Sequence, residues 1–316
     1  MKPIDKKLLR THHFFMQSIV IRAISFLLMV IIAFSLKRVG VLRKEDGYAL
    51  SRVMMNITLP CVIINSFGTT TFSGKRLVFI LVGLGVNFIL LLISFLFTRN
   101  ASREDKIYYT LCLPAYNIGC FTFPFASSML GPQGALTVCL VDSGNSFQCL
   151  GLDYAITKAM VEDKKINFLS MIKPLLKVPS FLCYIIFIPL ALLNIKLPSQ
   201  IFTFTSLVAA ANGPIAMFMI GLLLEPSFDK SIIKKVLNVI VIRYLLAAIL
   251  GFIIFKTFPF SYEVRKAAVV VLFSPISSAS PSFTLDLKGN TSLASTVNSL
   301  SIMISIVLIP LLVIFV

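Results

Sequence analysis

The sequence predicts an all-α integral membrane protein, with ten transmembrane helices arranged as two inverted five-helix repeats. The composition is strongly apolar, with 57% hydrophobic and 13% charged residues, whereas soluble domains carry about 25% charged residues. The mean hydropathy is +0.93. Apolar runs of about 20 residues, the length that crosses a bilayer, recur along the chain. Helix-breaking residues interrupt matching runs in the two halves, as in inverted repeats.

The apolar runs divide the chain into a tail, two groups of five spans and one longer connection. We expect an N-terminal tail at 1–16, a first repeat at 17–157, a cytoplasmic connecting loop at 158–169 and a second repeat at 170–316. No small-residue cleavage site clearly follows the first run, so it is expected to be a span and not a signal peptide. The predicted spans are 17–36, 50–67, 77–97, 107–130, 134–157, 170–193, 201–224, 236–257, 264–286 and 292–315.

Lysine and arginine are more numerous in the loops after odd-numbered spans than in the tail and the loops after even-numbered spans. The positive-inside rule therefore predicts that both termini are extracytoplasmic and that the protein is a multi-pass protein of the cell membrane. The basic tail is an exception to this pattern. The net charge of +16 follows from this loop bias and does not indicate a nucleic-acid partner.

The residue types exclude several function classes. All six cysteines lie in apolar runs without CxxC spacing, and the only histidines are His12 and His13. Neither a metal site nor a cofactor is therefore expected. The sequence lacks HExxH, GxSxG and P-loop motifs, which argues against an enzyme or an ATP-driven pump. No signalling domain is attached, which argues against a receptor.

Spans 4 and 9 each contain residues that interrupt a helix. Span 4 includes "CLPAYNIGCFTFPFASSMLGPQG" from residue 112, and span 9 includes "SPISSASPSF". At 1.5 Å per residue, Asn117 lies about 15 Å from the start of span 4. Ser277 and Ser278 lie about 15–18 Å into span 9 from the other face, so both interruptions fall near the bilayer midplane. The interrupting residues are Pro114, Asn117, Gly119 and Pro124 in span 4, and Pro275, Ser277, Ser278 and Pro281 in span 9.

Interrupted backbone at that depth is tolerated where protein or a water-filled cavity satisfies its polar groups. Two interruptions that approach from opposite sides would form one polar pocket, and the half-helix N-termini would favour an anion. The alternative is that the prolines only kink the helices for packing. Because the interruptions occur at matching places in both halves, we favour a substrate site there.

Spans 2 and 7 provide a second matched pair. Asn56 precedes Pro60, and Asn212 precedes Pro214. Since each half has an odd number of spans, the second copy enters the membrane from the opposite side. We expect Asn56 either to line the pocket or to cap freed backbone. Four prolines are the expected helix-break scaffold: Pro60, Pro114, Pro214 and Pro275.

Other polar residues lie deep in the later spans. Asp142, Asn145 and Asp153 share one face of span 5, together with Cys149. Because intramembrane carboxylates are costly, Asp142 and Asn145 are the candidates for coupling to protons or sodium. The alternative is that Asp142 faces water. We expect Asp153 to be interfacial.

Asn298 in span 10 is expected either to contact substrate or to form an interhelical hydrogen bond. Arg243 in span 8 is expected to extend to the membrane interface, with pairing to a substrate carboxylate as the alternative.

The motif from Asn117 to Pro124, followed by Gly131, resembles the fourth span of the auxin efflux carrier family. "LSRVMMNITLPCVII" and "GPIAMFMIGLLLE" resemble its second and seventh spans. The resemblance implies a fold related to bile acid/sodium symporters, with crossed, unwound spans 4 and 9. It implies substrate contact at Asn117 and a crossing marked by Pro124 and Pro281. It also implies a homodimer of the compact bacterial type, which carries small carboxylates.

The predicted function is secondary active transport of a small organic anion, expected to be a carboxylate, by alternating access. The alternative is a passive channel or facilitator on the same fold.

Overall fold

The computed structural model describes residues 6–68, 70, 72–163, 165–166, 168–225 and 232–316. The side chains of residues 6–16, 18, 168 and 170 lie outside the described part, and with them the two histidines of the predicted tail. The regular secondary structure of the described chain is helical apart from one isolated β-bridge, which confirms the all-α class. The helices are α1 (Lys6–Arg38), α2 (Lys44–Val53), η1 (Met54–Thr58), α3 (Leu59–Gly68), η2 (Gly74–Leu77), α4 (Val78–Thr98), α5 (Arg103–Cys112), η3 (Ile118–Thr122), α6 (Phe123–Met129), α7 (Gly131–Phe147), η4 (Gln148–Leu152), α8 (Asp153–Glu162), α9 (Phe168–Leu175), α10 (Pro179–Leu192), α11 (Ser199–Ala210), α12 (Asn212–Leu223), α13 (Ile233–Thr257), α14 (Tyr262–Leu272), α15 (Ala279–Asp286) and α16 (Thr291–Phe315).

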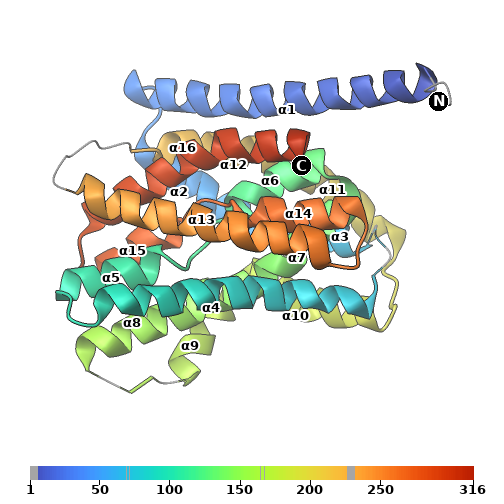
Figure 1. Cartoon of the computed structure of the whole chain (residues 1–316). Coiled ribbons are helices and arrows are strands. Elements are labelled where there is room, and N and C mark those ends of the chain that lie inside the picture. The colour runs from blue at the N-terminus through green and yellow to red at the C-terminus, as the bar shows by residue number, and fades with distance from the viewer. Residues whose placement is uncertain (1–5, 69, 71, 164, 167, 226–231) are drawn as a thin grey trace.

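Most helices run along a common direction, with α1 at one edge of the molecule, packed against α12 and α16 (Figure 1). The centre is formed by α7, which packs against α4, α6 and α14 and is buried without interruption from Gly134 to Asn145. The helix that carries Asp142, Ser143 and Asn145 therefore lies in the core of the molecule.

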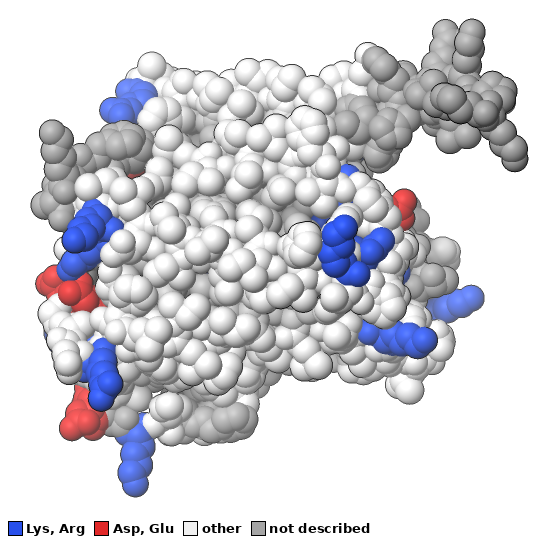
Figure 2. Space-filling view, viewed as in Figure 1, with Lys and Arg blue, Asp and Glu red and all other residues white. Residues whose placement is uncertain are grey.

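The surface has the charge distribution of a membrane-spanning protein. In Figure 2, charged side chains gather at the two ends of the visible face, and the broad belt between them is uncharged. Large apolar side chains are exposed to an extent that is unusual in soluble proteins, including Leu96, Leu207 and Phe252. Six helices of the described chain are long and apolar enough to cross a membrane: Ile19–Arg38, Lys44–Gly68, Gly74–Thr98, Ser199–Leu223, Ile233–Thr257 and Thr291–Phe315.

The other four predicted spans do not meet this criterion, each for a physical reason. Spans 4 and 9 are interrupted. Span 6 is shorter than predicted, because α9 ends before Val178 and the residue before a proline disfavours the α conformation. Span 5 is helical from Gly131 to Glu162, but buried polar residues such as Asp142 and Gln148 lower its hydropathy.

The matched spans 2 and 7 lie side by side. Here α2 packs against α12, and α3 packs against α11, so the two spans run antiparallel. The Thr58 hydroxyl donates a hydrogen bond of 2.8 Å to the side-chain carbonyl of Asn212. This buried contact joins the two proline-containing segments that the sequence pairs.

Candidate functional site

The first interruption separates α5 from η3. Helix α5 ends at Cys112, and regular helical geometry resumes only at Ile118. Pro114 lies in this gap, where its missing N–H cannot continue the helix. Beyond the gap, η3 is a π-helical turn that ends two residues before Pro124. The π-helical turn η1 also ends two residues before a proline, Pro60, so the same spacing occurs in both turns.

The second interruption separates α14 from α15. Helix α14 ends at Leu272, and α15 begins at Ala279. Pro275 lies in this gap, as Pro114 does in the first. The Ser277 hydroxyl accepts a hydrogen bond of 3.2 Å from the backbone N–H of Ala279, and so caps the start of the second half-helix.

The two interruptions meet through their main chains. Tyr116 and Ile276 form an antiparallel β-bridge. The N–H of Asn117 donates to the carbonyl of Pro275 at 2.8 Å, and the N–H of Ser277 donates to that of Ala115 at 3.2 Å. Each interrupted segment therefore satisfies part of the backbone that the other has lost from its helix.

Side chains of α7 and α16 pair the backbone of the two bridging residues. The side-chain amide of Asn145 donates to the carbonyl of Tyr116 at 3.0 Å and accepts from its N–H at 3.3 Å. In the second half, the amide of Asn298 donates to the carbonyl of Ile276 at 2.8 Å, and the Ser301 hydroxyl accepts from its N–H at 2.9 Å. The two bridging residues are therefore held in equivalent ways by different helices.

Arg243 of α13 joins the ends of both first half-helices. Its guanidinium donates to the carbonyl of Leu113, after α5, and to that of Ser274, after α14, at 3.4 Å. It also lies 4.0 Å from the ring centroid of Tyr116. Carbonyls at helix C-termini carry partial negative charge, so a buried cation is favourable there. Arg243 is 2% exposed and does not reach the interface, so that expectation was wrong.

A small cavity of about 70 Å³ lies beside the crossing. It is bordered by the starts of both second half-helices, at Ile118 and Ala279. All three π-helical turns of the described chain contribute to its wall, with Met55 from η1, Cys120 from η3 and Cys149 from η4. Such turns are frequent at functional sites, because they leave carbonyls without helical partners.

Four polar side chains of the cavity wall have no hydrogen-bond partner among the described residues. They are Asn117, Ser146, Ser180 and Ser278. Asn117 and Ser180 are buried, Ser146 is half-buried and Ser278 is exposed. A buried polar group is costly unless it contacts water or a ligand. The cavity therefore offers neutral donors and acceptors that the protein itself does not use.

Asp142 contributes the carboxylate of the cavity wall. It accepts hydrogen bonds from the hydroxyl of Tyr184 at 2.8 Å and from the amide of Asn145 at 3.1 Å, and the backbone N–H of Gly119 also points to it. A Cβ at Gly119 would lie 3.1 Å from Asp142 Oδ2, so glycine permits this close approach. The carboxylate thus lies at the partially positive start of η3. It does not face open water, since it is 4% exposed.

The structure brings six of the predicted site residues together at the cavity: Asn117, Gly119, Asp142, Asn145, Ser277 and Ser278. The prolines Pro114 and Pro275 lie in the two gaps. Asn298 does not line the cavity, and its amide donates to the carbonyls of Ile276 and Ser277 in the second gap.

The remaining predicted residues lie elsewhere. Asn56 is exposed and donates to the carbonyl of Arg52 at 2.7 Å, one turn earlier in its own helix. Pro124 and Pro214 line a separate hollow of about 480 Å³, and Pro281 lines another of about 490 Å³. Pro60 is buried in α3, next to Leu59 of the cavity wall.

Sequence reasoning missed the parts played by Arg243, Tyr184 and Asp153. Asp153 is fully buried, so the expectation that it is interfacial was wrong, and neither carboxylate oxygen has a hydrogen-bond partner among the described residues. Its position on the same helical face as Asp142 was the available signal. Arg243 stands alone within an apolar run, which also indicated an inward-facing role.

Interrupted helices that cross beside a polar cavity, within a belt of apolar surface, define a class of membrane proteins that move solutes across a bilayer. The chain belongs to the membrane transport protein family, the auxin efflux carrier family, whose model matches residues 18–313. It is therefore a membrane transporter by family.

Two relatives are similar over part of the chain. An uncharacterized transporter of Methanothermobacter thermautotrophicus is 30% identical over 135 residues, which cover 41% of this chain and 45% of the relative. An uncharacterized transporter of Methanocaldococcus jannaschii is 26% identical over 211 residues, which cover 63% of this chain and 67% of the relative. The chain thus spans less than half the length of the first of these relatives.

Proposed function

We propose that this protein is a secondary active transporter that moves a small organic anion, with a carboxylate group, across the cell membrane. The observation that carries the proposal is the crossing of two interrupted helices beside a cavity in which four polar side chains lack partners among the described residues. Backbone groups of the crossing are bonded within the protein, so the polar groups open to a ligand are side chains of the cavity wall.

The anionic group binds at the start of α15, because the other half-helix start is already occupied. Asp142 lies at the start of η3 and would repel a second negative charge there. At the start of α15 the cavity wall is formed by Ser277, Ser278 and Ala279, and none of these side chains carries a negative charge. Ser278 and the free amide of Asn117 supply neutral hydrogen bonds beside it.

Asp142 couples transport to a proton or a sodium ion, with Asn145 as its partner. The hydroxyl of Tyr184 donates a hydrogen bond to the Asp142 carboxylate. Tyr184 lies on α10, whereas Asp142 and Asn145 lie on α7. A change of charge at Asp142 would therefore alter a hydrogen bond between two different helices at the substrate cavity. This arrangement supports a coupling role, because the ion and the substrate would share one wall.

Alternating access uses the inverted symmetry of ten spans. The antiparallel contact of spans 2 and 7 and the equivalent support of Tyr116 and Ile276 both favour such a repeat. The central cavity of about 70 Å³ is smaller than the roughly 300 Å³ of ordinary ligand pockets, so it would have to widen to hold a substrate of several carbon atoms. The hollow lined by Pro124 and Pro214 and the hollow lined by Pro281 lie toward opposite ends of the continuous helix Lys44–Gly68. We assign these two hollows as the two entrances.

Counterflow by purified protein in liposomes tests the proposal, with a panel of small carboxylates and with or without sodium. A carrier exchanges labelled for unlabelled substrate and saturates, whereas a passive channel shows no counterflow. Asn117→Ala should abolish counterflow while the melting temperature stays within about 2 °C, because the side chain has no protein partner to lose. Exchange at the wild-type rate in this variant would contradict the assigned site.

The predicted orientation, with both termini extracytoplasmic, has its own test. A cysteine placed at Lys165, in the connection between α8 and α9, should react with a membrane-impermeant reagent only from the cytoplasmic side. Labelling of intact cells from outside would reverse the assigned topology.

A further inference from the structure

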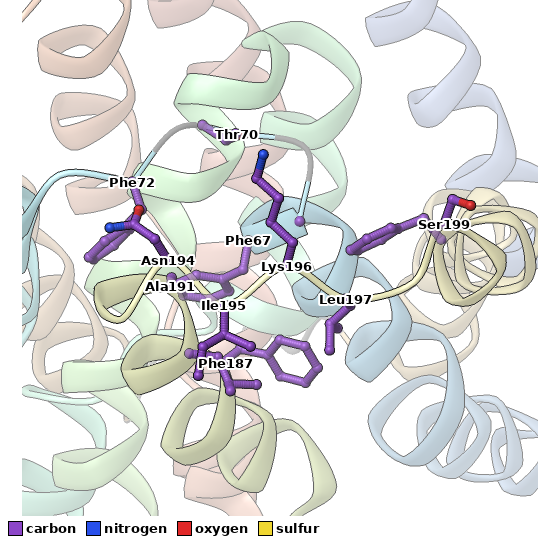
Figure 3. A pocket seen from close by; sticks show the side chains of 13 residues that line it. Phe67, Thr70, Phe72, Phe187, Ala191, Asn194, Ile195, Lys196, Leu197 and Ser199 are labelled. Atoms are coloured by element: carbon purple, nitrogen blue, oxygen red, sulfur yellow. The ribbon is translucent and has the colours of Figure 1, made fainter.

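A further cavity of about 480 Å³, different from the central cavity and from the two hollows assigned as entrances, lies away from the crossing (Figure 3). It is formed by the end of α3, the end of α10 and the start of α11, with the short connections beside them. No residue of its wall belongs to the central cavity, as far as the described chain shows. Its volume lies within the range of about 300–1,000 Å³ typical of small-molecule sites.

The wall of this cavity is aromatic. Four rings line it: Phe67, Phe72, Phe187 and Phe202. Gly68 leaves room for one of them, because a Cβ there would lie 1.9 Å from the ring of Phe202. Leucine and isoleucine side chains complete an apolar surface that can hold an acyl chain or an aromatic body.

One cation lies at the rim. Lys196 is the single charged side chain among the described residues of the wall. Figure 3 shows its side chain extending from the connection between α10 and α11 toward Thr70. The Thr70 hydroxyl is buried and has no hydrogen-bond partner in the described part of the chain. The ammonium group therefore lies on the side of Thr70, and no carboxylate among the described residues of the wall neutralises the lysine.

We propose that this cavity binds an anionic amphiphile, with its apolar body among the phenylalanine rings and its carboxylate or phosphate between Lys196 and Thr70. The position at the helix ends favours such a ligand, because lipid headgroups lie at that level and lysine interacts with anionic ones. The ligand comes either from the bilayer, as an anionic phospholipid, or from solution, as an amphiphilic carboxylate. This site does not depend on the proposed substrate or on the coupling ion.

The absence of tryptophan from the sequence makes a direct measurement practical. Leu197→Trp places a single fluorophore at the rim, and its emission is followed during titration with decanoate in detergent. We expect a saturable change with decanoate and a change at least tenfold weaker in apparent affinity with decanol, which lacks the charge. Adding Lys196→Gln should weaken decanoate binding by about tenfold and leave decanol unaffected.

Lys256→Gln is the matched control. Lys256 lies at the end of α13 beside the ring of Phe252 and lines none of the cavities described above. It should therefore leave decanoate binding unchanged. Ala191→Phe, which fills the cavity from α10, should abolish binding of both probes while the protein stays monodisperse.

Vesicles distinguish the two sources. Brominated phosphatidylglycerol should quench the Leu197→Trp fluorophore more strongly than brominated phosphatidylcholine if the ligand is a lipid, and Lys196→Gln should remove the difference. Saturable decanoate binding with equal quenching by the two lipids would assign a soluble carboxylate. Equal affinity for decanoate and decanol, or decanoate affinity that is the same with and without Lys196, would overturn the proposal.

Discussion

Around Tyr116 one asparagine, Asn145, supplies both backbone hydrogen bonds, whereas around Ile276 the same two bonds are divided between Asn298 and Ser301. The supporting side chains lie on α7 in the first case and on α16 in the second. Equivalent backbone geometry has thus been reached with different side chains. The interruption occurs at the same place in both halves of the molecule, but the side chains that bond its backbone differ.

The two interruptions also differ in charge. Beside the first lies the carboxylate of Asp142, at the start of η3, whereas Arg243 contacts both interruptions. Beside the second, the described wall of the cavity is formed by serine and alanine. We infer that the first half of the protein carries the ion chemistry and the second half receives the anion. The predictions below test this division, beginning with the largest expected effect.

Arg243→Met should lower the free energy of unfolding by about 2–5 kcal/mol, because the carbonyls of Leu113 and Ser274 both lose their donor in a buried site. Denaturant unfolding in detergent measures the change. Arg52→Met is the control, since Arg52 is exposed. Equal stability of the two variants would show that the cation does not hold the crossing together.

Asn145→Ala should cost more stability than Asn298→Ala. The first substitution leaves the N–H and the carbonyl of Tyr116 unpaired and removes a donor from Asp142. The second leaves two carbonyls unpaired, while Ser301 still accepts from Ile276. At roughly 1–3 kcal/mol for each buried unpaired group, we expect a difference of about 1 kcal/mol or more in unfolding measurements. The reverse order would mean that the second interruption is the more dependent on its support.

Asp142→Asn should remove most of the dependence of transport on pH or sodium, and change initial rates by tenfold or more at the condition of maximal coupling. The substitution keeps a side chain of the same shape beside Gly119 but removes its charge. Ser278→Ala, at the second interruption, should weaken apparent substrate affinity severalfold and leave the ion dependence intact. Uptake by reconstituted protein measures both. If the ion dependence persists in Asp142→Asn, coupling does not reside at the first interruption.

Much of the crossing could be predicted from the sequence, because helix interruption depends on local residues. Pro114 and Pro275 remove backbone donors wherever they occur, and their distance from the span ends places them at mid-depth. Asn117, Ser277 and Ser278 were predicted for the same reason, and they line the cavity. Resemblance to the family added the crossing itself, which local residues do not specify.

Contacts between distant segments could not be predicted in this way. Arg243 contacts carbonyls that lie 130 and 31 residues away in the chain, and no local pattern specifies those partners. Asn56 does not reach the cavity, because its side chain bonds the carbonyl of Arg52, four residues earlier in its own helix. Span 6 was predicted too long, since hydropathy does not register the bend before Pro179.

Tyr116→Phe is expected to have the smallest effect, and it separates the two features of the first interruption. The Tyr116 hydroxyl is buried and has no hydrogen-bond partner among the described residues, so its removal should change stability by no more than about 0.5 kcal/mol or increase it. Tyr116→Leu also removes the ring that lies 4.0 Å from the Arg243 guanidinium, and should cost about 1–2 kcal/mol more. A large loss in Tyr116→Phe would assign the hydroxyl a role in binding or water contact. Equal stability of the phenylalanine and leucine variants would instead show that the crossing needs only an apolar side chain at this position, as Ile276 already provides in the second half.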